Sequence, residues 1–351
     1  MIRTRCTAAV IGATGTVGQR LVRRLHDHPW FELTALAAST RSAGKAYGEA
    51  AHWLLPTPMP VGPAGMTVAG LDQLGSCDLV FSALGSAAAR EVEPRLARRG
   101  LTVVSNASAL RMAPDVPLLI PEVNPEHLKL LDHQGFGPGA VVTNPNCATV
   151  GLVLSLKPLS DAFGVKAVQV TTLQAISGAG HPGVSSLDIL GNALPLIPGE
   201  EDKLESEPQK ILGRVSSGSI TPSDVVISSQ TNRVPVVDGH LLSVSVRLGT
   251  PATLDEAAAA IEAFRSPVAD LRLPSSPERP VVLATEGDRP QPRIDAGRDH
   301  GMTVTVGRLR ACPIFDLRYV ALVHNTERGA AGAAVLNAEL LAAKGRLART
   351  A

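Results

Sequence analysis

The sequence predicts an α/β protein with two domains, and three observations support this prediction. The chain has 351 residues, which is enough for two domains with separate cores. Up to residue 143, short apolar runs alternate with helical patterns, as in βαβ units around a parallel sheet. Farther along, long runs of alternating apolar and polar residues predict a largely antiparallel sheet.

The elements of the first domain can be predicted in order along the chain. Apolar residues at helical spacing predict a helix over residues 17–25, directly after a glycine-rich turn. A second helix is expected at residues 87–99, and the Pro- and Gly-rich residues 56–65 are expected to form a surface connection. Short apolar runs predict strands at residues 8–11, 33–38, 78–84, 101–104 and 141–143.

A helix marks the change from the first domain to the second. It is expected to begin at Asn146, a residue type that favours helix N-termini, and to end at Lys157-Pro158. The Ala-rich residues 329–347 predict a terminal helix that could pack back on the first domain. The strands expected in between are residues 167–173, 225–228, 241–247, 302–309 and 317–324, with a shorter one at 281–284.

Charge and composition argue against several classes of function. The 33 Lys and Arg residues balance 32 Asp and Glu residues, so no charge excess points to nucleic acid. No apolar segment is long enough for a signal peptide or a membrane span, so we expect a cytoplasmic protein without membrane partners. The four cysteines are Cys6, Cys77, Cys147 and Cys312. They form no CxxC pair, which argues against a disulfide framework and against a metal site.

The loop between the first strand and the first helix has the composition of a nucleotide-binding turn. Backbone N–H groups and the helix dipole can hold a pyrophosphate at this place, and small residues let it approach. The second glycine falls one place later than in the commoner GxGxxG spacing, and glycine-rich turns also occur for packing alone. The loop residues are Gly12, Ala13, Thr14, Gly15, Thr16 and Val17.

The end of the second strand indicates which dinucleotide would bind. Sites for NAD usually place an acidic residue here to bond the ribose 2′-OH. This chain instead has Ser39, Arg41 and Ser42, with Lys45 nearby. Cations and hydroxyls suit a 2′-phosphate, so we predict a preference for NADP; the alternative is a solvated basic turn.

Cys147 and His240 have the context of a catalytic pair. Cys147 would begin a helix, where unpaired N–H groups and the helix dipole lower the pKa of a thiol. The other cysteines are expected to be packing residues. His240 follows the Asp238-Gly239 turn at the start of a predicted strand, and thiol catalysis needs such an acid or base. Sequence alone does not place the two side chains together.

Further polar residues could hold a charged substrate, although charged residues usually lie on solvated faces. Gln174 follows a predicted strand and precedes glycines near the expected domain cleft, where the glycines could also simply form a turn. The charged candidates are Arg111, Glu200, Glu201, Lys203 and Arg233.

Seven motifs together resemble the aspartate-semialdehyde dehydrogenase family, in the form found in archaea and fungi. They occur in the family's order and cover nearly the whole chain. One departure is Gly85, where the family often has proline in a loop that lies along the cofactor. The motifs are GATGTVG, SNASALRMAPDVPLLIPEVNPEHL, VVTNPNCATVGLVLSLKPL, TTLQAISGAGHPGVSSLDILGN, GEEDKLESEPQKILG, RVPVVDGHLLSVSV and HNTERGAAGAAVLNAELL.

The resemblance implies a domain organisation and an assembly. A Rossmann-type dinucleotide-binding domain would comprise residues 1–148 plus 330–351, and an α+β catalytic and dimerisation domain with a largely antiparallel sheet would comprise residues 149–329. Members of this family would associate through the sheet of the second domain, so a homodimer or homotetramer is expected. The implied cofactor is NADP, with no metal.

The resemblance also implies a reaction: reversible, NADPH-dependent reductive dephosphorylation of L-aspartyl 4-phosphate to L-aspartate 4-semialdehyde, in lysine, threonine and methionine biosynthesis. Cys147 would form a thioester, which hydride converts to a thiohemiacetal that releases the aldehyde. His240 would shuttle the protons, Gln174 would orient the intermediate, and backbone N–H groups near Cys147 could stabilise its oxyanion.

Substrate and cofactor residues follow from the same resemblance. Arg233 would pair with the α-carboxylate, Glu200 or Glu201 would meet the amine, and Arg111 with Lys203 would hold the phosphate. The cofactor would contact the glycine-rich loop and the residues after the second strand. The positions expected near the nicotinamide are Ser177, Gly178 and Asn325.

Two related enzymes and one non-catalytic function remain as alternatives. N-acetyl-glutamyl-phosphate reductase and malonyl-CoA reductase share the thioester chemistry and the dinucleotide domain. An acetylated amine needs no acid, so the acidic GEEDK segment favours the free amino acid as substrate. A non-catalytic NADP-binding sensor on the same fold is disfavoured because both Cys147 and His240 are present.

Overall fold

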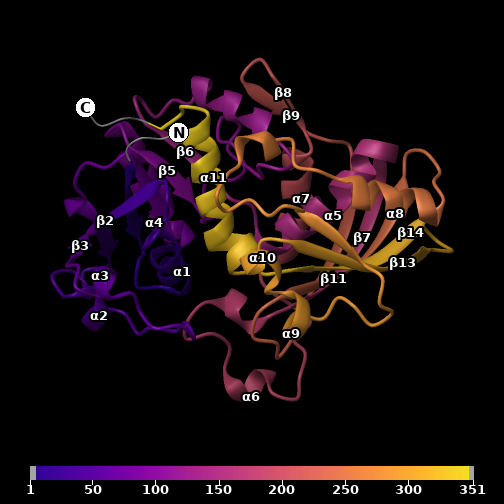
Figure 1. The fold of residues 1–351 in the computed structure, drawn as a ribbon, viewed down its shortest axis with the longest axis horizontal. Coiled ribbons are helices and arrows are strands. Elements are labelled where there is room, and N and C mark those ends of the chain that lie inside the picture. The colour runs from indigo at the N-terminus through magenta and orange to yellow at the C-terminus, as the bar shows by residue number, and fades with distance from the viewer. Residues whose placement is uncertain (1–4, 348–351) are drawn as a thin grey trace.

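The computed structural model describes residues 5–347, and the chain folds around two six-stranded sheets that lie side by side (Figure 1). The first sheet is parallel throughout, in the order β3-β2-β1-β4-β5-β6. The expected strands are all present, and β3 escapes prediction because three residues are too few to show a pattern. The strands are β1 (Cys6–Ile11), β2 (Phe31–Ala38), β3 (Val68–Gly70), β4 (Leu79–Ser82), β5 (Thr102–Ser105) and β6 (Ala140–Thr143).

The second sheet has the order β10-β7-β11-β14-β13-β12 and is mixed rather than largely antiparallel. Its three central pairs are antiparallel, but the pairs β10-β7 and β12-β13 at the two edges are parallel. Parallel neighbours need long crossover connections, which an alternating strand pattern does not reveal. The strands are β7 (Val165–Gln174), β10 (Val226–Arg233), β11 (His240–Leu248), β12 (Val281–Ala284), β13 (Val304–Ala311) and β14 (Leu317–Val323).

Helix α5 (Cys147–Phe163) packs on the second sheet together with α7 (Glu200–Ile211) and α8 (Leu254–Ala263). It begins where the sequence predicts, but the expected end at Lys157-Pro158 is wrong. The helix continues past Pro158 because the next turn still buries apolar surface, including the fully buried Leu159, which offsets the hydrogen bond that proline cannot make.

The first sheet is covered by α1 (Thr16–Leu25), α4 (Ser86–Arg98) and α11 (Gly332–Ala343). The terminal helix is shorter than predicted, because residues 327–331 form a π turn before it. Helix α11, yellow in Figure 1, lies between the two sheets and shares a core with the first one. Residues 1–4 and 348–351, which belong to the expected dinucleotide-binding domain, lie outside the described residues.

Short elements fill the connections. Residues 56–65 run over the surface as expected, with Val61 largely exposed. Within residues 5–347, no helix is both long and apolar enough to cross a membrane. The short elements are α2 (Tyr47–Ala50), α3 (Val61–Ala64), α6 (Ser186–Ile189), α9 (Pro292–Asp295), α10 (Arg298–Gly301), the hairpin β8 (Arg214–Ser216) and β9 (Ser219–Thr221), and the 3-10 turns Leu71–Gln73, Pro125–His133, Ile176–Ala179 and Ala269–Leu271.

Candidate active site

The structure brings Cys147 and His240 together at the junction of the two sheets. Cys147 is the first residue of α5 and His240 is the first residue of β11. The distance from Cys147 Sγ to His240 Nε2 is 3.1 Å, which is within hydrogen-bond reach. Two residues separated by 93 positions in the chain therefore form one thiol–imidazole pair.

Three side chains fix the start of α5 around the thiol. Asn146 caps the helix, because its Oδ1 accepts hydrogen bonds from the N–H groups of Ala148 and Thr149. Its Nδ2 donates to Glu200 Oε2 at 2.7 Å, and its backbone N–H donates to Glu207 Oε2 at 2.7 Å. The first-turn N–H groups of Ala148 and Thr149 are thus already occupied and do not face a substrate.

The pKa of Cys147 is raised, not lowered as the helix N-terminus predicts. Burial is the largest cause and Glu200 adds to it, while Arg111, Arg233 and Lys203 act in the opposite direction; the result is a thiol pKa of about 12. Removing a thiolate from water therefore outweighs the helix dipole and the three nearby cations. In this state the sulfur is therefore a neutral thiol at physiological pH.

His240 is fully buried, and its two ring nitrogens have different partners. Nδ1 accepts a hydrogen bond from the Ala175 N–H at 3.0 Å. The neutral ring therefore carries its proton on Nε2, which faces the sulfur. Burial, followed by the charges of Arg233 and His324, lowers the pKa of His240 to about 3. The imidazole is neutral at physiological pH.

Most of the predicted substrate residues line one pocket of about 370 Å³ beside the sulfur: Arg111, Gln174, Glu200, Lys203 and Arg233. Arg233 Nη1 donates to the Ala175 carbonyl at 2.9 Å, and Lys203 Nζ pairs with Glu200 Oε1 at 2.7 Å. Glu201 does not line this pocket. Its Oε1 accepts the Thr231 N–H at 3.0 Å, on the side facing β10.

Glu207 and Lys210 belong to this site and escape the sequence analysis. Glu207 Oε1 pairs with Arg111 Nη1 at 2.8 Å, while its other oxygen holds Asn146. Lys210 Nζ donates to the carbonyls of Arg111, Ala113 and Val116, and burial lowers its pKa to about 8. The available signal is helical spacing, since both residues share a face of α7 with Glu200.

The glycine-rich loop has the geometry of a nucleotide cradle. Gly12 has φ +74°, and a Cβ there would lie 2.6 Å from the Ala83 carbonyl oxygen, so only glycine fits. Gly15 precedes α1 without a side-chain cap, and the first turn of that helix carries no acidic residue. The backbone N–H groups of the first turn of α1 therefore have no side-chain partner and fit a pyrophosphate.

The individual loop residues differ in their surroundings. Thr16 and Val17 line the pocket beside Cys147. Ala13 is buried and its carbonyl accepts the Tyr47 hydroxyl at 2.9 Å, while the Thr14 carbonyl accepts Gln19 Nε2 at 2.9 Å. Ala13 and Thr14 therefore shape the loop through their carbonyls.

The remaining cofactor positions lie at both ends of the site. In the turn after β2, the Ser42 N–H donates a hydrogen bond to the Ser39 carbonyl at 2.9 Å, and the side chain of Arg41 is exposed. On the other side, Ser177, Gly178 and Asn325 line the pocket, and Asn325 Nδ2 donates to Ser177 Oγ at 2.8 Å.

Two further findings bear on the sequence predictions. Gly85 lines the pocket with φ −66°, the angle that proline would impose, so the departure from the family pattern leaves the backbone in the same conformation. In the part of the chain that the structure describes, no three His, Cys, Asp or Glu side chains cluster to hold a metal ion.

Comparisons with known proteins agree with this site. Residues 7–131 match the family model "Semialdehyde dehydrogenase, NAD binding domain", and residues 156–328 match "Semialdehyde dehydrogenase, dimerisation domain". The aspartate-semialdehyde dehydrogenase of Archaeoglobus fulgidus is 50% identical over 96% of this chain and 98% of its own length. The enzyme of Methanothermobacter thermautotrophicus is 51% identical over 95% of this chain and 97% of its own length.

A solved structure extends the likeness to three dimensions. The Candida albicans aspartate-semialdehyde dehydrogenase with NADP superposes with a TM-score of 0.91 at 43% identity, covering 98% of this chain and all of that one. Full-length identity, fold and the thiol–imidazole pair thus agree, and the chain belongs to the aspartate-semialdehyde dehydrogenase family.

Proposed function

We propose that this site catalyses the NADPH-dependent conversion of L-aspartyl 4-phosphate to L-aspartate 4-semialdehyde and phosphate, and the reverse reaction. The observation that carries the proposal is the 3.1 Å contact between Cys147 Sγ and His240 Nε2 inside a pocket lined by both cationic and acidic side chains. This set of charges matches a substrate with a phosphate, a carboxylate and an ammonium group. The activity places the enzyme in lysine, threonine and methionine biosynthesis.

Cys147 is the nucleophile. Its sulfur attacks the acyl carbon of the substrate, so that a carbon–sulfur bond forms and the carbon–oxygen bond to phosphate breaks. The thiol proton passes to His240 Nε2 and from there to the departing phosphate. Gln174, buried beside the sulfur, orients the acyl group.

The proton transfer sets a condition on the segment that follows β7. For Nε2 to accept the thiol proton, the ring proton must lie on Nδ1, where the Ala175 N–H now points at 3.0 Å. Two N–H groups cannot face each other at that distance. We infer that this hydrogen bond is released when substrate and cofactor bind, so that His240 can act as a base.

The charged residues divide the substrate between them. Arg233 pairs with the α-carboxylate through its planar guanidinium. Glu200, rather than Glu201, meets the amine, because Glu200 lines the pocket. Arg111 and Lys203 hold the phosphate, and Glu207 keeps Arg111 in place through their 2.8 Å ion pair.

NADP(H) is held by this chain's glycine-rich loop and, when bound, supplies the hydride that reduces the thioester. The N–H groups at the start of α1 receive the pyrophosphate, and Ser39, Arg41 and Ser42 receive the 2′-phosphate. Ser177, Gly178 and Asn325 face the nicotinamide. A Cβ at Gly178 would lie 2.9 Å from Arg233 Nη1, so a side chain here would displace the Arg233 guanidinium from its present position.

The domain division, assembly and location are proposed on similar grounds. Residues 1–148 plus 330–351 form the NADP-binding domain, and residues 149–329 form the catalytic and dimerisation domain. The second sheet has exposed apolar residues such as Val226, 65% exposed, and we assign it the contact of a homodimer or homotetramer. A catalytic thiol must stay reduced, which fits the cytoplasm.

The test is an assay of NADP reduction with an aldehyde and inorganic phosphate. Multiple turnovers of L-aspartate 4-semialdehyde should occur only when phosphate is present, and NAD should replace NADP poorly. N-acetyl-glutamate 5-semialdehyde with phosphate, and malonate semialdehyde with coenzyme A, should give little turnover. Preference for either of these, or no turnover with any aldehyde, would overturn the proposed function.

A further inference from the structure

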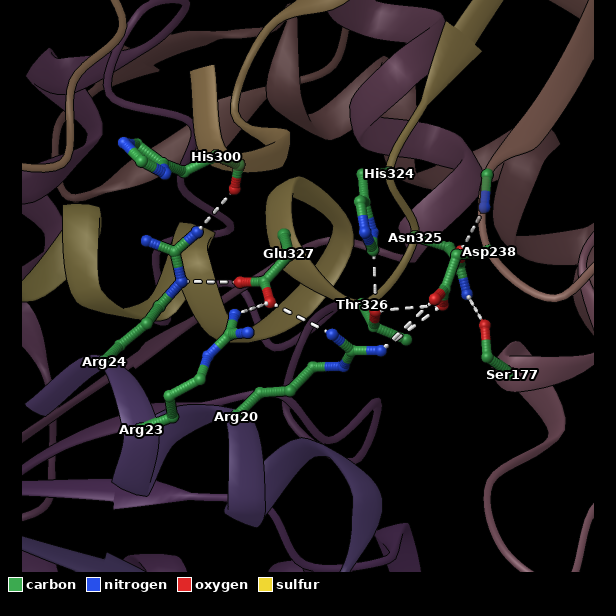
Figure 2. Close-up of polar contacts among 11 residues, drawn as sticks. Arg20, Arg23, Arg24, Ser177, Asp238, His300, His324, Asn325, Thr326 and Glu327 are labelled. Atoms are coloured by element: carbon green, nitrogen blue, oxygen red, sulfur yellow. Dashed lines mark hydrogen bonds and ion pairs between the residues drawn. The ribbon is translucent and has the colours of Figure 1, made fainter. Parts of the chain in front are cut away.

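A buried ionic network joins the cofactor-loop helix α1 to the catalytic part of the chain (Figure 2). Glu327, in the π turn before α11, accepts hydrogen bonds from Arg20 Nη1 at 3.1 Å, Arg23 Nη2 at 2.5 Å and Arg24 Nε at 2.5 Å. Burial by itself would raise the pKa of Glu327, but the three guanidinium groups outweigh it and hold that pKa below its usual range. The carboxylate therefore stays charged between the two parts of the molecule.

Arg20 differs from its two neighbours in a second contact. Its Nη2 lies 3.4 Å from Asp238 Oδ1, whereas Arg23 pairs with Glu327 alone and Arg24 reaches the His300 carbonyl instead. The Arg20 side chain is 10% exposed, compared with 31% for Arg23. Arg20 thus bridges Glu327 and Asp238, as Figure 2 shows.

Asp238 belongs to the turn that carries His240. Gly239 has φ +99°, and its N–H donates to Asn325 Oδ1 at 2.8 Å. Asp238 Oδ1 also accepts the Thr326 hydroxyl at 3.4 Å. The backbone directly before the catalytic imidazole is therefore held by the loop at residues 325–326 and by one arginine of the cofactor helix.

The same network lies behind the nucleophile and the cofactor loop. Thr16, which lines the pocket, is one helical turn before Arg20 on the same face of α1. Gly329, in the same π turn as Glu327, packs on Cys147 so closely that a Cβ there would lie 2.6 Å from Cys147 Cβ. A change at Arg20 is thus transmitted to the turn before His240 by direct contacts.

We propose that Arg20 is a positioning residue for the reaction: by bridging Glu327 and Asp238 it holds His240 in line with Cys147. The inference rests on the proposed roles of these two residues. Proton transfer needs heavy atoms about 3 Å apart, and small misplacements of reacting groups cost rate more than binding. Loss of the bridge therefore lowers kcat and leaves the affinity for substrate nearly unchanged.

The experiment compares Arg20→Met with the matched control Arg23→Met. Each variant leaves Glu327 with two arginine partners, but only Arg20→Met also removes the contact with Asp238. We expect Arg20→Met to lower kcat on the order of tenfold, with KM values for aldehyde, phosphate and NADP within about twofold of wild type. Arg23→Met should keep kcat within about twofold, with a similar change in melting temperature.

A second variant keeps the test decisive if Arg20→Met folds poorly. Asp238→Asn removes the negative charge that pairs with Arg20. It should lower kcat as Arg20→Met does, with little effect on KM. Combining it with Arg20→Met should add almost nothing, because both remove one interaction. Additive losses would contradict the bridge.

Two other outcomes overturn the inference. Equal losses of kcat in Arg20→Met and Arg23→Met would show that the network only stabilises the fold. An effect confined to the KM for NADP would assign Arg20 to cofactor binding instead. If the wild-type enzyme does not turn over L-aspartate 4-semialdehyde with phosphate, the proposed function fails first; an active wild type with two equivalent variants refutes only the role of Arg20.

Discussion

At Cys147, one carboxylate and three cations surround the sulfur, and burial still decides its protonation. Cys147 and His240 could be chosen as candidates from sequence, because NPNC and DGH stand in recognisable local contexts, and their catalytic roles stay predictions. The protonation of the pair could not be predicted, because it depends on the Ala175 N–H and on the depth of the pocket. Neither is a property of the residues next to Cys147 or His240 in the chain.

The raised thiol pKa leads to a prediction for the enzyme without substrate or cofactor. Alkylation of Cys147 by iodoacetamide should be slow at neutral pH and should rise with pH without a plateau, because the thiol pKa is about 12 and a neutral His240 with its proton on Nε2 cannot act as a base. The measurement is the alkylation rate against pH, with a Cys147→Ser variant to subtract the other cysteines. A plateau below about pH 8 would show a preformed thiolate instead.

At the scale of elements, strands and helices with a clear period were predictable, and irregular connections were not. Apart from β3, the strands of both sheets follow from apolar patterns, and the start of α5 follows from the Asn146 cap. Helix α7 was missed because its sequence is mostly charged, with Pro208 inside it. With α7 unseen, Glu207 and Lys210 could not be placed next to Arg111.

Lys210 provides a test of how α7 supports the phosphate site. Lys210→Met leaves the carbonyls of Arg111, Ala113 and Val116 without their donor, which should cost about 2 kcal/mol or more of unfolding free energy. Because the loop that carries Arg111 loosens, the KM for phosphate should rise several-fold in the aldehyde-oxidising direction. Denaturant unfolding and steady-state kinetics measure the two effects.

A suitable control for this variant is Lys166→Met, since Lys166 is exposed on β7 and pairs only with Asp224. It should change neither stability nor the KM for phosphate appreciably. Unfolding free energies and KM values that are alike in the two variants would show that Lys210 does not hold the Arg111 loop.

At the scale of the whole molecule, the site lies where the two sheets meet, and α11 lies between them (Figure 1). The strand–helix alternation predicted the first sheet and the alternating apolar and polar runs predicted the second, but the parallel edge pairs of the second sheet were not predictable from pattern. The arginine network between α1 and Glu327 was not predictable either, because its members are about 300 residues apart. Tertiary contacts between distant segments make the catalytic arrangement.

Buried neutral imidazoles make the fold sensitive to acid. Burial lowers the pKa of His127, His240 and His324 below the ordinary 6.5. The unfolded chain therefore binds more protons below pH 6.5. Stability is full above that value and is lost as pH falls, by up to roughly 1.4 kcal/mol per pH unit for each group. The melting temperature should fall steadily from pH 6.5 to 4.

Two variants isolate this effect. His240→Gln should show a shallower decline of melting temperature with acid than wild type, because one buried imidazole is gone. His52→Gln, at an exposed position, should follow wild type. A wild-type melting temperature that stays constant between pH 6.5 and 5 would contradict the neutral buried state of these rings.

The most direct test of the central claim, acyl transfer through Cys147, is a single-turnover experiment without phosphate. Enzyme mixed with NADP and L-aspartate 4-semialdehyde should produce a burst of about one NADPH per chain and then stop, with the acyl group on the peptide that contains Cys147. Cys147→Ser should give no burst while still binding NADPH. A wild-type enzyme that shows no burst, or an acyl group attached to a different residue, would contradict the account.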